Sequence, residues 1–162
     1  MIQVDARDVA ILAALCRDGR MSKAALAQQV GLSATPCWNR LRRLEDAGLI
    51  ESYHAKINLR KLAPHITVFV LAELRDHTAA SFRAFEAAVN RYDEVTACWA
   101  VGGGYDYLIQ IVTRDIDAYQ QLVDDMLDAR LGLARYFTYI VTKTVKQGAM
   151  LPFDVLLGAD PE

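Results

Sequence analysis

The sequence predicts an α+β protein: a winged helix-turn-helix over residues 1–63, joined to a βαββαβ domain of the ferredoxin-like type over residues 64–162. Two patterns carry this prediction. Residues 1–48 hold three short segments whose apolar residues recur at helical spacing. From Ile66 onward, strand-like apolar runs alternate with amphipathic helical segments in the order β-α-β-β-α-β. The length of 162 residues fits one domain or two small ones, so the division rests on these patterns.

The first two helices have recognisable end signals. Asp5 is expected to cap a helix that ends near Asp18. Ser22 is expected to cap a second, short helix that runs to Val30. Gly31 should end this helix, because glycine adopts the left-handed conformation after a helix end without steric cost.

The third helix follows after a very short turn. Ser33 or Thr35 is expected to cap it, and Pro36 falls in the first turn, where its missing N–H does no harm. The helix should run to about Asp46. Residues 49–58 then alternate loosely in polarity, as a short strand or wing would.

The second part of the chain begins near residues 58–65, where Pro64 breaks the helical pattern. Two of its β-rich runs are separated by Gly102–Gly104, which is a hairpin signal. The expected strands are residues 66–74, 95–101, 107–113 and 135–146, and the expected helices are residues 79–91 and 115–129.

Composition narrows the class of protein. Hydrophobic residues make up 53% and charged residues 23%, which suits a packed core and argues against disorder. No apolar run approaches the roughly 20 residues of a membrane span, so no membrane partner is expected. The three cysteines (Cys16, Cys37 and Cys98) are odd in number and far apart, so they form no disulfide framework. We therefore expect a cytoplasmic protein.

Charge is distributed unevenly along the chain. Residues 1–63 hold ten Lys and Arg against six Asp and Glu, a net charge of +4, whereas residues 64–162 hold eight against fourteen, a net charge of −6. Between Gly19 and Leu44 there are five basic residues and no acidic one. A basic half joined to an acidic half suggests that the first half meets a polyanion. A solvated basic face with no partner would give the same composition.

The helix, short turn and basic helix together form a helix-turn-helix pattern, which predicts binding to double-stranded DNA. Leu41 and Leu44 should face inward, which leaves Thr35, Asn39 and Arg42 on the exposed side of the third helix. Arg and Asn make bidentate contacts with guanine and adenine edges, whereas Arg20 and Lys23 are expected to touch phosphates. Three-helix modules also bind proteins, which stays open as an alternative. The full predicted DNA-binding set is Arg20, Lys23, Ser33, Thr35, Pro36, Asn39, Arg40, Arg42 and Arg43.

The chain resembles the Lrp/AsnC (feast/famine) transcriptional regulators over residues 2–147. The most specific part is the run Gly31-Leu32-Ser33 followed by Thr35-Pro36-Cys37, and the resemblance resumes at Gly103-Gly104-Tyr105-Asp106-Tyr107 and at residues 136–141. It implies a winged helix-turn-helix followed by an amino-acid-sensing domain. It also implies dimers formed through the sheet of the second domain, often assembled into octamers. The tail, residues 147–162, extends beyond the resemblance and is expected to form an extra strand or a subunit contact.

In proteins of this family the glycine turn borders a site where a small amino acid binds between dimers. The resemblance therefore implies an effector site made of Gly103, Gly104, Tyr105 and Asp106, faced by Thr138, Tyr139 and Ile140 of a neighbouring subunit. Backbone N–H groups at the glycines could hold the carboxylate of the effector, and Asp106 could accept from its amino group.

Simpler interpretations of the turn remain. Gly102–Gly104 needs no function if it only closes a hairpin, and no Lys-Ser/Thr follows it as in a phosphate loop. Asp106 could be an ordinary turn-capping aspartate. Trp99, beside the turn, is expected to pack in the core, as large aromatic residues usually do. For the intersubunit contact we expect apolar strand residues such as Val68, Val70, Tyr139 and Val141.

No enzyme is predicted. The histidines, His54, His65 and His77, are scattered and suggest neither a zinc site nor a Ser-His-Asp group, so no catalytic residue, metal or cofactor is expected beyond the amino-acid effector. Cys37 falls at a helix start, where thiol pKa values are lowered, but it is interpreted as a packing residue. The predicted function is a DNA-binding regulator whose assembly and DNA affinity respond to an amino acid. The alternative is an amino-acid-sensing regulatory or scaffold protein that does not bind DNA.

Overall fold

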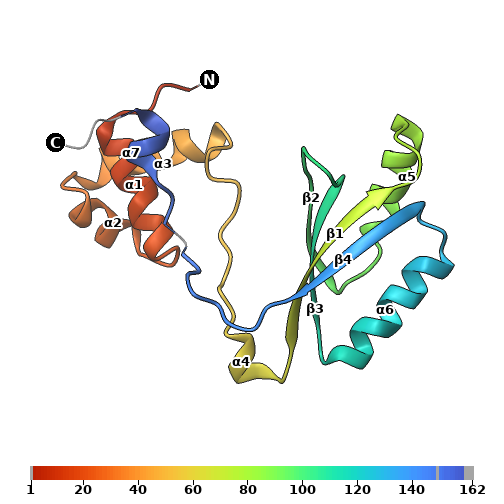
Figure 1. The fold of residues 1–162 in the computed structure, drawn as a ribbon. Helices are drawn as coiled ribbons and strands as arrows, with labels where there is room; N and C mark the ends of the chain where they lie inside the picture. Colours follow the sequence, from red (N-terminus) through yellow and green to blue (C-terminus); the bar gives the residue numbers. More distant parts are fainter. Residues whose placement is uncertain (1, 149, 159–162) are drawn as a thin grey trace. The chain divides into compact units, whose positions relative to one another are not determined.

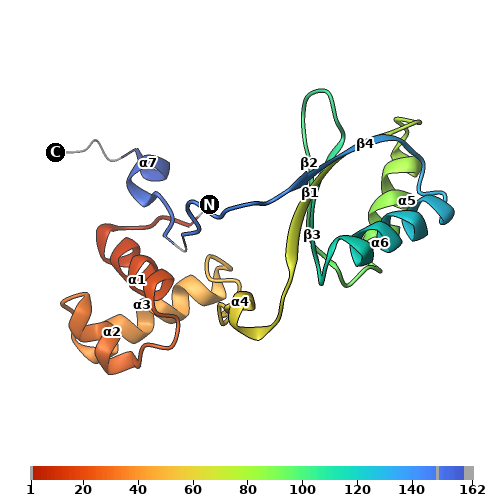
Figure 2. The same ribbon diagram turned by 60° about the horizontal axis from the view of Figure 1, so that its bottom comes forward.

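The computed structural model describes residues 2–148 and 150–158. Contacts group the chain into two compact units, shown in Figures 1 and 2. The helical unit contains residues 2–56 together with the described residues between 145 and 158, and the sheet unit contains Ile57–Thr144. This grouping differs from the expected domains at both ends of the second one. It starts earlier than residue 64, and the tail is grouped with the N-terminal helices.

Three helices form the body of the helical unit: α1 (Ala6–Arg17), α2 (Lys23–Gln29) and α3 (Ala34–Asp46). The expected caps are confirmed, because the Asp5 carboxylate accepts from the N–H groups of Arg7 and Asp8, and the Ser22 hydroxyl accepts from the N–H of Ala25. The apolar faces of the helices meet in one cluster. Its buried residues are Ile11, Ala14, Leu26, Ala27, Val30, Cys37, Leu41 and Leu44.

The turn between α2 and α3 depends on Gly31, as predicted. Its φ angle is +64°, a left-handed conformation that other residues rarely adopt. The N–H of Gly31 donates to the carbonyl of Gln28 at 3.2 Å, and the N–H of Leu32 donates to the carbonyl of Ala27 at 2.9 Å. These two bonds form a Schellman motif, which satisfies the last carbonyl groups of α2. The motif turns the chain sharply into α3.

Neither residues 49–58, expected to form a strand or wing, nor the described part of the tail, expected to form a strand or a subunit contact, contains a strand. Residues 49–58 have no strand structure, and a short helix, α4 (Leu59–Leu62), follows them. A strand needs a hydrogen-bonded neighbour, and the described residues of the helical unit contain no other strand. In the tail, the short helix α7 (Phe153–Leu157) replaces the extra strand. Residues 149 and 159–162 of the tail lie outside the described residues.

The sheet unit has the predicted ferredoxin-like order of elements: β1 (Ile66–Leu74), α5 (Ala79–Val89), β2 (Val95–Ala100), β3 (Tyr107–Thr113), α6 (Ile116–Asp128) and β4 (Leu133–Ile140). The four strands form one antiparallel sheet in the order β2-β3-β1-β4. Both helices cover the same face of this sheet (Figure 2). The α+β fold class is therefore confirmed.

The core of the sheet unit lies between the sheet and its two helices. Burial alternates along β1, so that Val68, Val70, Ala72 and Leu74 point toward the helices and pack with Phe85 of α5. The expectation that Val68 and Val70 would contact another subunit is wrong for this reason. Alternation separates two faces of a strand, but it does not tell which face is covered.

Within the sheet unit, no described helix covers the other face of the sheet. We call it the open sheet face, and its large apolar residues come from all four strands: Phe69, Leu71, Trp99, Leu108, Phe137 and Tyr139. Cross-strand pairs establish that they share a face, since Phe69 pairs with Tyr139, and Leu71 pairs with both Phe137 and Leu108. Trp99 pairs with Leu108 and is 46% exposed, so its expected place in the core is wrong.

Strand β4 is shorter than expected. It ends at Ile140 instead of residue 146, and the N–H of Val141 makes one more bond, to the carbonyl of Thr67 at 2.9 Å. Its partner β1 begins at Ile66, so residues after Val141 have no strand to pair with. No described helix of the protein is long and apolar enough to cross a lipid bilayer.

Candidate nucleic-acid interface and ligand site

Helix α3 separates its residues into a buried and an exposed side, as predicted. Cys37, Leu41 and Leu44 are buried in the apolar cluster of the helical unit. Burial raises the pKa of the Cys37 thiol, which agrees with a packing role. Thr35 and Asn39 are exposed on the opposite side of the helix. This side therefore presents polar groups from successive turns to an external partner.

Arg42 also lies on the exposed side. Its side chain is 69% exposed, and its Nε atom lies 3.7 Å from a carboxylate oxygen of Asp46, one turn further along the helix. An ion pair between two exposed side chains contributes little to stability. The guanidinium group is therefore available for another contact.

Two of the arginines predicted to bind DNA form ion pairs within the helical unit. Arg40 donates to the carboxylates of Asp5 and Asp8, at 2.7 and 2.9 Å, and Arg43 donates to the other oxygen of Asp8. The Asp8 side chain is 0% exposed, and these contacts connect the start of α1 to the middle of α3. Arg40 and Arg43 thus hold α3 against the start of α1 through Asp8.

The charge on Asp8 is stabilised in this cluster. Burial acts to raise the pKa of this carboxyl group, but hydrogen bonds from the N–H of Asp5 and from Arg40 and Arg43 outweigh it, and the pKa lies below the ordinary value. Sequence reasoning missed Asp8. The only signal was its place three residues after Asp5, which makes the two residues a capping box.

The remaining predicted DNA contacts surround the start of α3. Ser33 is its N-cap residue by backbone geometry, but its hydroxyl makes no capping hydrogen bond, and Pro36 in the first turn is exposed. Arg20 is exposed before α2. The Nζ atom of Lys23 lies 3.2 Å from the centroid of the Trp38 ring. Trp38, on α3, was not among the residues singled out from the sequence.

The glycine turn joins β2 to β3 at one end of the sheet. The N–H of Val101 donates to the carbonyl of Asp106 at 2.9 Å and closes the turn. Gly102, Gly103 and Gly104 are exposed, and a Cβ atom added at any of them would meet no atom within 4 Å. Gly103 has a φ angle of +136°, which favours glycine. The backbone of the turn is therefore accessible, as anion binding by its N–H groups would require.

Asp106 is tied to the neighbouring strand. One carboxylate oxygen, Oδ2, accepts from the N–H of Leu74 at 2.8 Å and lies 3.1 Å from Nε2 of His77. The backbone N–H of Asp106 also donates to the carbonyl of Ala72 at 2.9 Å. These contacts are those of a capping aspartate. The role of His77 was missed, because 29 residues separate the pair and only the fold brings them together.

The three residues expected to face the turn from a neighbouring subunit project from both sides of β4. Thr138 and Ile140 pair with Val70 and Val68, so they lie on the helix side of the sheet, whereas Tyr139 lies on the open sheet face. The Thr138 hydroxyl is hydrogen-bonded to Tyr119 of α6. A ligand on one face of the sheet could therefore meet Thr138 and Ile140 or Tyr139, but not all three.

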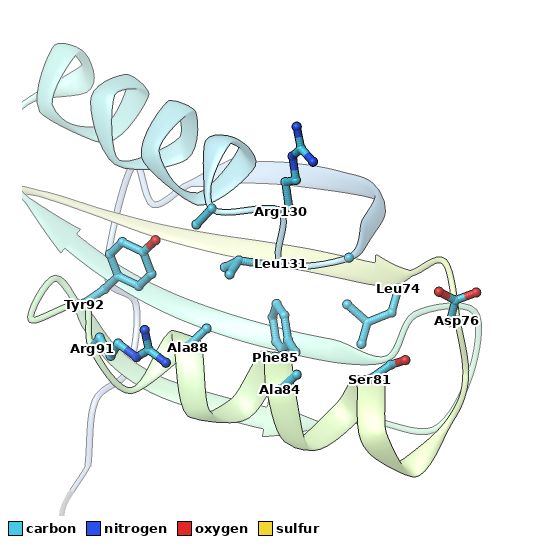
Figure 3. Close-up of a pocket in the computed structure, with 12 residues that line it drawn as sticks. Leu74, Asp76, Ser81, Ala84, Phe85, Ala88, Arg91, Tyr92, Arg130 and Leu131 are labelled. Carbon is cyan, nitrogen blue, oxygen red and sulfur yellow. The ribbon is translucent and has the colours of Figure 1, made fainter.

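A cavity of about 590 Å³ lies on the helix side of this end of the sheet, between α5 and the connection from α6 to β4. Figure 3 shows the apolar side chains of Leu74, Phe85 and Leu131 between these elements, with Tyr92 and Asp76 toward opposite ends. Leu74 links the cavity to the turn, since its N–H binds Asp106. No group of metal-ligating side chains occurs among the described residues.

The helix-turn-helix with an exposed recognition helix, followed by a ferredoxin-like unit, defines a class: DNA-binding transcriptional regulators that carry a separate ligand-binding domain. Comparison with known families makes the assignment specific. A family described as "Winged helix-turn-helix DNA-binding" matches residues 4–51, and one described as "Lrp/AsnC ligand binding domain" matches residues 67–151. The chain belongs to the Lrp/AsnC family, so it is a DNA-binding transcriptional regulator with a ligand-binding domain, and not an enzyme.

Individual relatives are similar to this protein along nearly the whole chain. The protein is 51% identical over 146 residues to the transcriptional regulatory protein DoeX of Halomonas elongata, covering 90% of this chain and 92% of the relative. It is 38% identical over 148 residues to the leucine-responsive regulatory protein of Salmonella typhimurium, covering 91% and 90%. A transcriptional regulator from Neisseria meningitidis, crystallised with L-Met, superimposes with a TM-score of 0.89 at 31% identity, covering 95% of this chain and 99% of that one.

Proposed function

We propose that this regulator binds operator DNA as a dimer or a larger assembly, and that a small amino acid changes both its assembly and its DNA affinity. The observation that carries the DNA-contact part is the polar, exposed side of α3 opposite Cys37, Leu41 and Leu44. The test is binding of the full chain to duplexes that the protein itself selects from a random-sequence library, with and without amino acids. An amino-acid-sensing scaffold that does not bind DNA would select no sequence.

Within this proposal the predicted DNA-binding residues divide into three roles. Thr35, Asn39 and Arg42 read base edges in the major groove. Arg20 and Lys23 contact phosphates, and Ser33 and Pro36 lie where the start of α3 approaches the backbone. Arg40 and Arg43 hold α3 against α1 through Asp8 and reach DNA from the flank. Their ion pairs support this narrower role.

Replacing Arg42 by alanine should weaken operator binding by roughly 1–3 kcal/mol, or about 5- to 150-fold, because a bidentate contact with a guanine edge is lost. The same change should relax selection at one base position. Competition binding at fixed salt, followed by selection with the variant, measures both effects. Arg17→Ala, which removes an exposed charge from α1, is the matched control. Parental affinity for Arg42→Ala would show that this residue does not read bases.

We infer that dimers form through the open sheet face. In one chain Trp99, Phe137 and Tyr139 are exposed, by 46%, 43% and 53%, and the other apolar residues of this face are half-buried. Monomeric proteins rarely leave a large contiguous apolar patch uncovered. A two-fold dimer carries two recognition helices, so its operators should be imperfect palindromes with half-sites about one DNA turn apart. Further association of dimers into octamers is part of the proposal.

The effector is proposed to bind at the glycine turn. The N–H groups of Gly103 and Gly104 would receive its carboxylate, beside the ring of Tyr105. The α-ammonium of the effector would donate to Oδ1 of Asp106, because both hydrogen bonds to this carboxylate within the described chain are made by Oδ2. Thr138 and Ile140, or Tyr139 from the opposite face, would then contact the effector side chain from a neighbouring subunit. A site that spans subunits would couple ligand binding to assembly, and assembly equally to ligand affinity.

Asp106→Asn should abolish the response to the effector and leave effector-free DNA binding nearly unchanged. An asparagine side chain can still accept from the N–H of Leu74, so the strand end keeps its cap while the charge that binds the ammonium is lost. Calorimetry of the full chain against the twenty amino acids identifies the effector and tests the variant. Asp128→Asn on α6 is the control for charge. A normal response from Asp106→Asn would leave the turn as a hairpin only.

A further inference from the structure

A tryptophan and a lysine meet on the surface of the helix-turn-helix. Lys23 is the first residue of α2, and its Nζ atom lies 3.2 Å from the centroid of the Trp38 ring on α3. The face of an indole attracts a cation through the ring quadrupole, more strongly than the other aromatic side chains do. The contact therefore fixes an ammonium group where the two helices of the motif meet.

Trp38 does not serve the core of the unit. Its side chain is 37% exposed and lies outside the buried cluster that contains its neighbour Cys37. Single exposed aromatic residues are common on proteins, so exposure alone does not indicate a function for Trp38. Its position does indicate one. Trp38 lies three residues after Thr35 and four before Arg42, so it borders the face proposed to read bases.

Lys23 differs from the basic residues of α3 in having no carboxylate against it. Arg40 and Arg43 pair with Asp8, and Arg42 pairs with Asp46, whereas no acidic group within the described ranges forms an ion pair with Lys23. A cation over an aromatic ring keeps its full charge and its N–H donors. Lys23 is thus held in position with its charge unpaired. An unpaired cation that meets a DNA phosphate can displace the counterions condensed there.

We propose that Trp38 is a positioning residue for DNA binding: its ring holds the Lys23 ammonium in place for a phosphate that flanks the bases read from α3. This inference rests on the proposed function, in which α3 enters the major groove and Lys23 contacts the backbone. A lysine that is ordered before binding loses less side-chain freedom when the complex forms.

The experiment uses the full chain, and a separate Trp99→Phe protein, in which Trp38 is the single tryptophan, serves only for the emission measurement. The variants are Lys23→Ala, Trp38→Ala, Trp38→Phe and the Lys23→Ala/Trp38→Ala double. Binding to a duplex selected by the parent protein, and to a scrambled duplex of equal length, is measured by fluorescence anisotropy at several salt concentrations. Trp38 emission is followed during the DNA titration, and thermal unfolding checks that each variant folds.

Lys23→Ala should make the negative slope of log K against log salt shallower by about 0.9 on both duplexes, the effect of losing one phosphate contact. Trp38→Ala should weaken binding to both duplexes about two- to fivefold, the size of an exposed cation–π contact, and should also make the slope shallower. The double variant should bind about as Lys23→Ala does. Trp38→Phe should keep most of the affinity, because phenylalanine retains an aromatic face. Trp38 emission should change as DNA saturates the protein.

Parental affinity and slope in Trp38→Ala, additive losses in the double variant, or unchanged Trp38 emission would each overturn the proposal. Comparing the variants also separates a failure of this proposal from a failure of the proposed function. If Lys23→Ala weakens binding and Trp38→Ala does not, the DNA contacts stand and only the role of Trp38 is wrong. If neither changes binding, Lys23 is not a phosphate contact, and the proposed set of contacts is wrong as well.

Discussion

Replacing Asp8 by alanine is expected to lower the free energy of unfolding of the helical unit by roughly 2–4 kcal/mol. The change removes a fully buried carboxylate that binds Arg40 and Arg43 and caps the N–H of Asp5. Arg43 loses its carboxylate partner and Arg40 keeps only Asp5, but both guanidinium groups are partly exposed and can turn to water, which keeps the loss below that of a wholly buried pair. Urea unfolding of the full chain, followed by circular dichroism, measures the effect.

The pH dependence of this difference identifies its cause. A carboxylate whose pKa is lowered by folding stabilises the protein above its unfolded pKa, and this stabilisation is lost as the pH falls through the folded value. The parent and Asp8→Ala should therefore differ fully above about pH 4 and converge in stronger acid. Asp46→Ala, which breaks only an exposed pair, should cost little at any pH. A difference that persisted unchanged at low pH would assign the effect to packing and not to charge.

Leu71→Glu should dissociate the assembly and, with it, nearly all specific DNA binding. Leu71 lies in the middle of the open sheet face, between Leu108 and Phe137, so a glutamate there would be buried without a partner in a dimer yet remain partly solvated in a monomer. A monomer reaches only one half-site, and losing the linked second contact removes about 10²–10⁴ in apparent affinity.

Sedimentation at micromolar concentration measures the first effect, with a monomer expected at 18.0 kDa. Gln121→Glu adds the same charge to an exposed position on α6 and should leave the assembly intact. A parent protein that sedimented as a monomer would refute the dimer itself. A variant that stayed dimeric would instead move the interface to another face of the protein.

The parts of the fold that were predicted correctly depend on short-range signals. Period-2 and period-3.6 patterns located β1, β3 and all the longer helices, and the caps at Asp5 and Ser22 and the turn at Gly31 follow from local backbone chemistry. The exposed side of α3 followed from the same periodicity, because Leu41 and Leu44 fix the buried side.

The errors all involve partners that are distant in sequence. Nothing near residues 49–58 indicated that no strand would be available to pair with them. Which face of β1 is buried depends on α5, whose Phe85 packs with Val68 and Val70. Likewise Asp8, which is 32 residues from Arg40 and 35 from Arg43, gave no sign in the sequence that it would bind them.

Beside the glycines, the β2–β3 turn is fixed from several directions: both main-chain groups of Asp106 and one of its carboxylate oxygens are hydrogen-bonded, and the Tyr107 hydroxyl donates to Glu86 of α5 at 2.9 Å. A ligand held here would therefore need to order only the glycines themselves, at roughly 1–2 kcal/mol for each residue. Open space at Gly102 and Gly104 would admit side chains, whereas the φ of Gly103 opposes one. Side chains can thus be introduced at two positions of the turn without disturbing the sheet below.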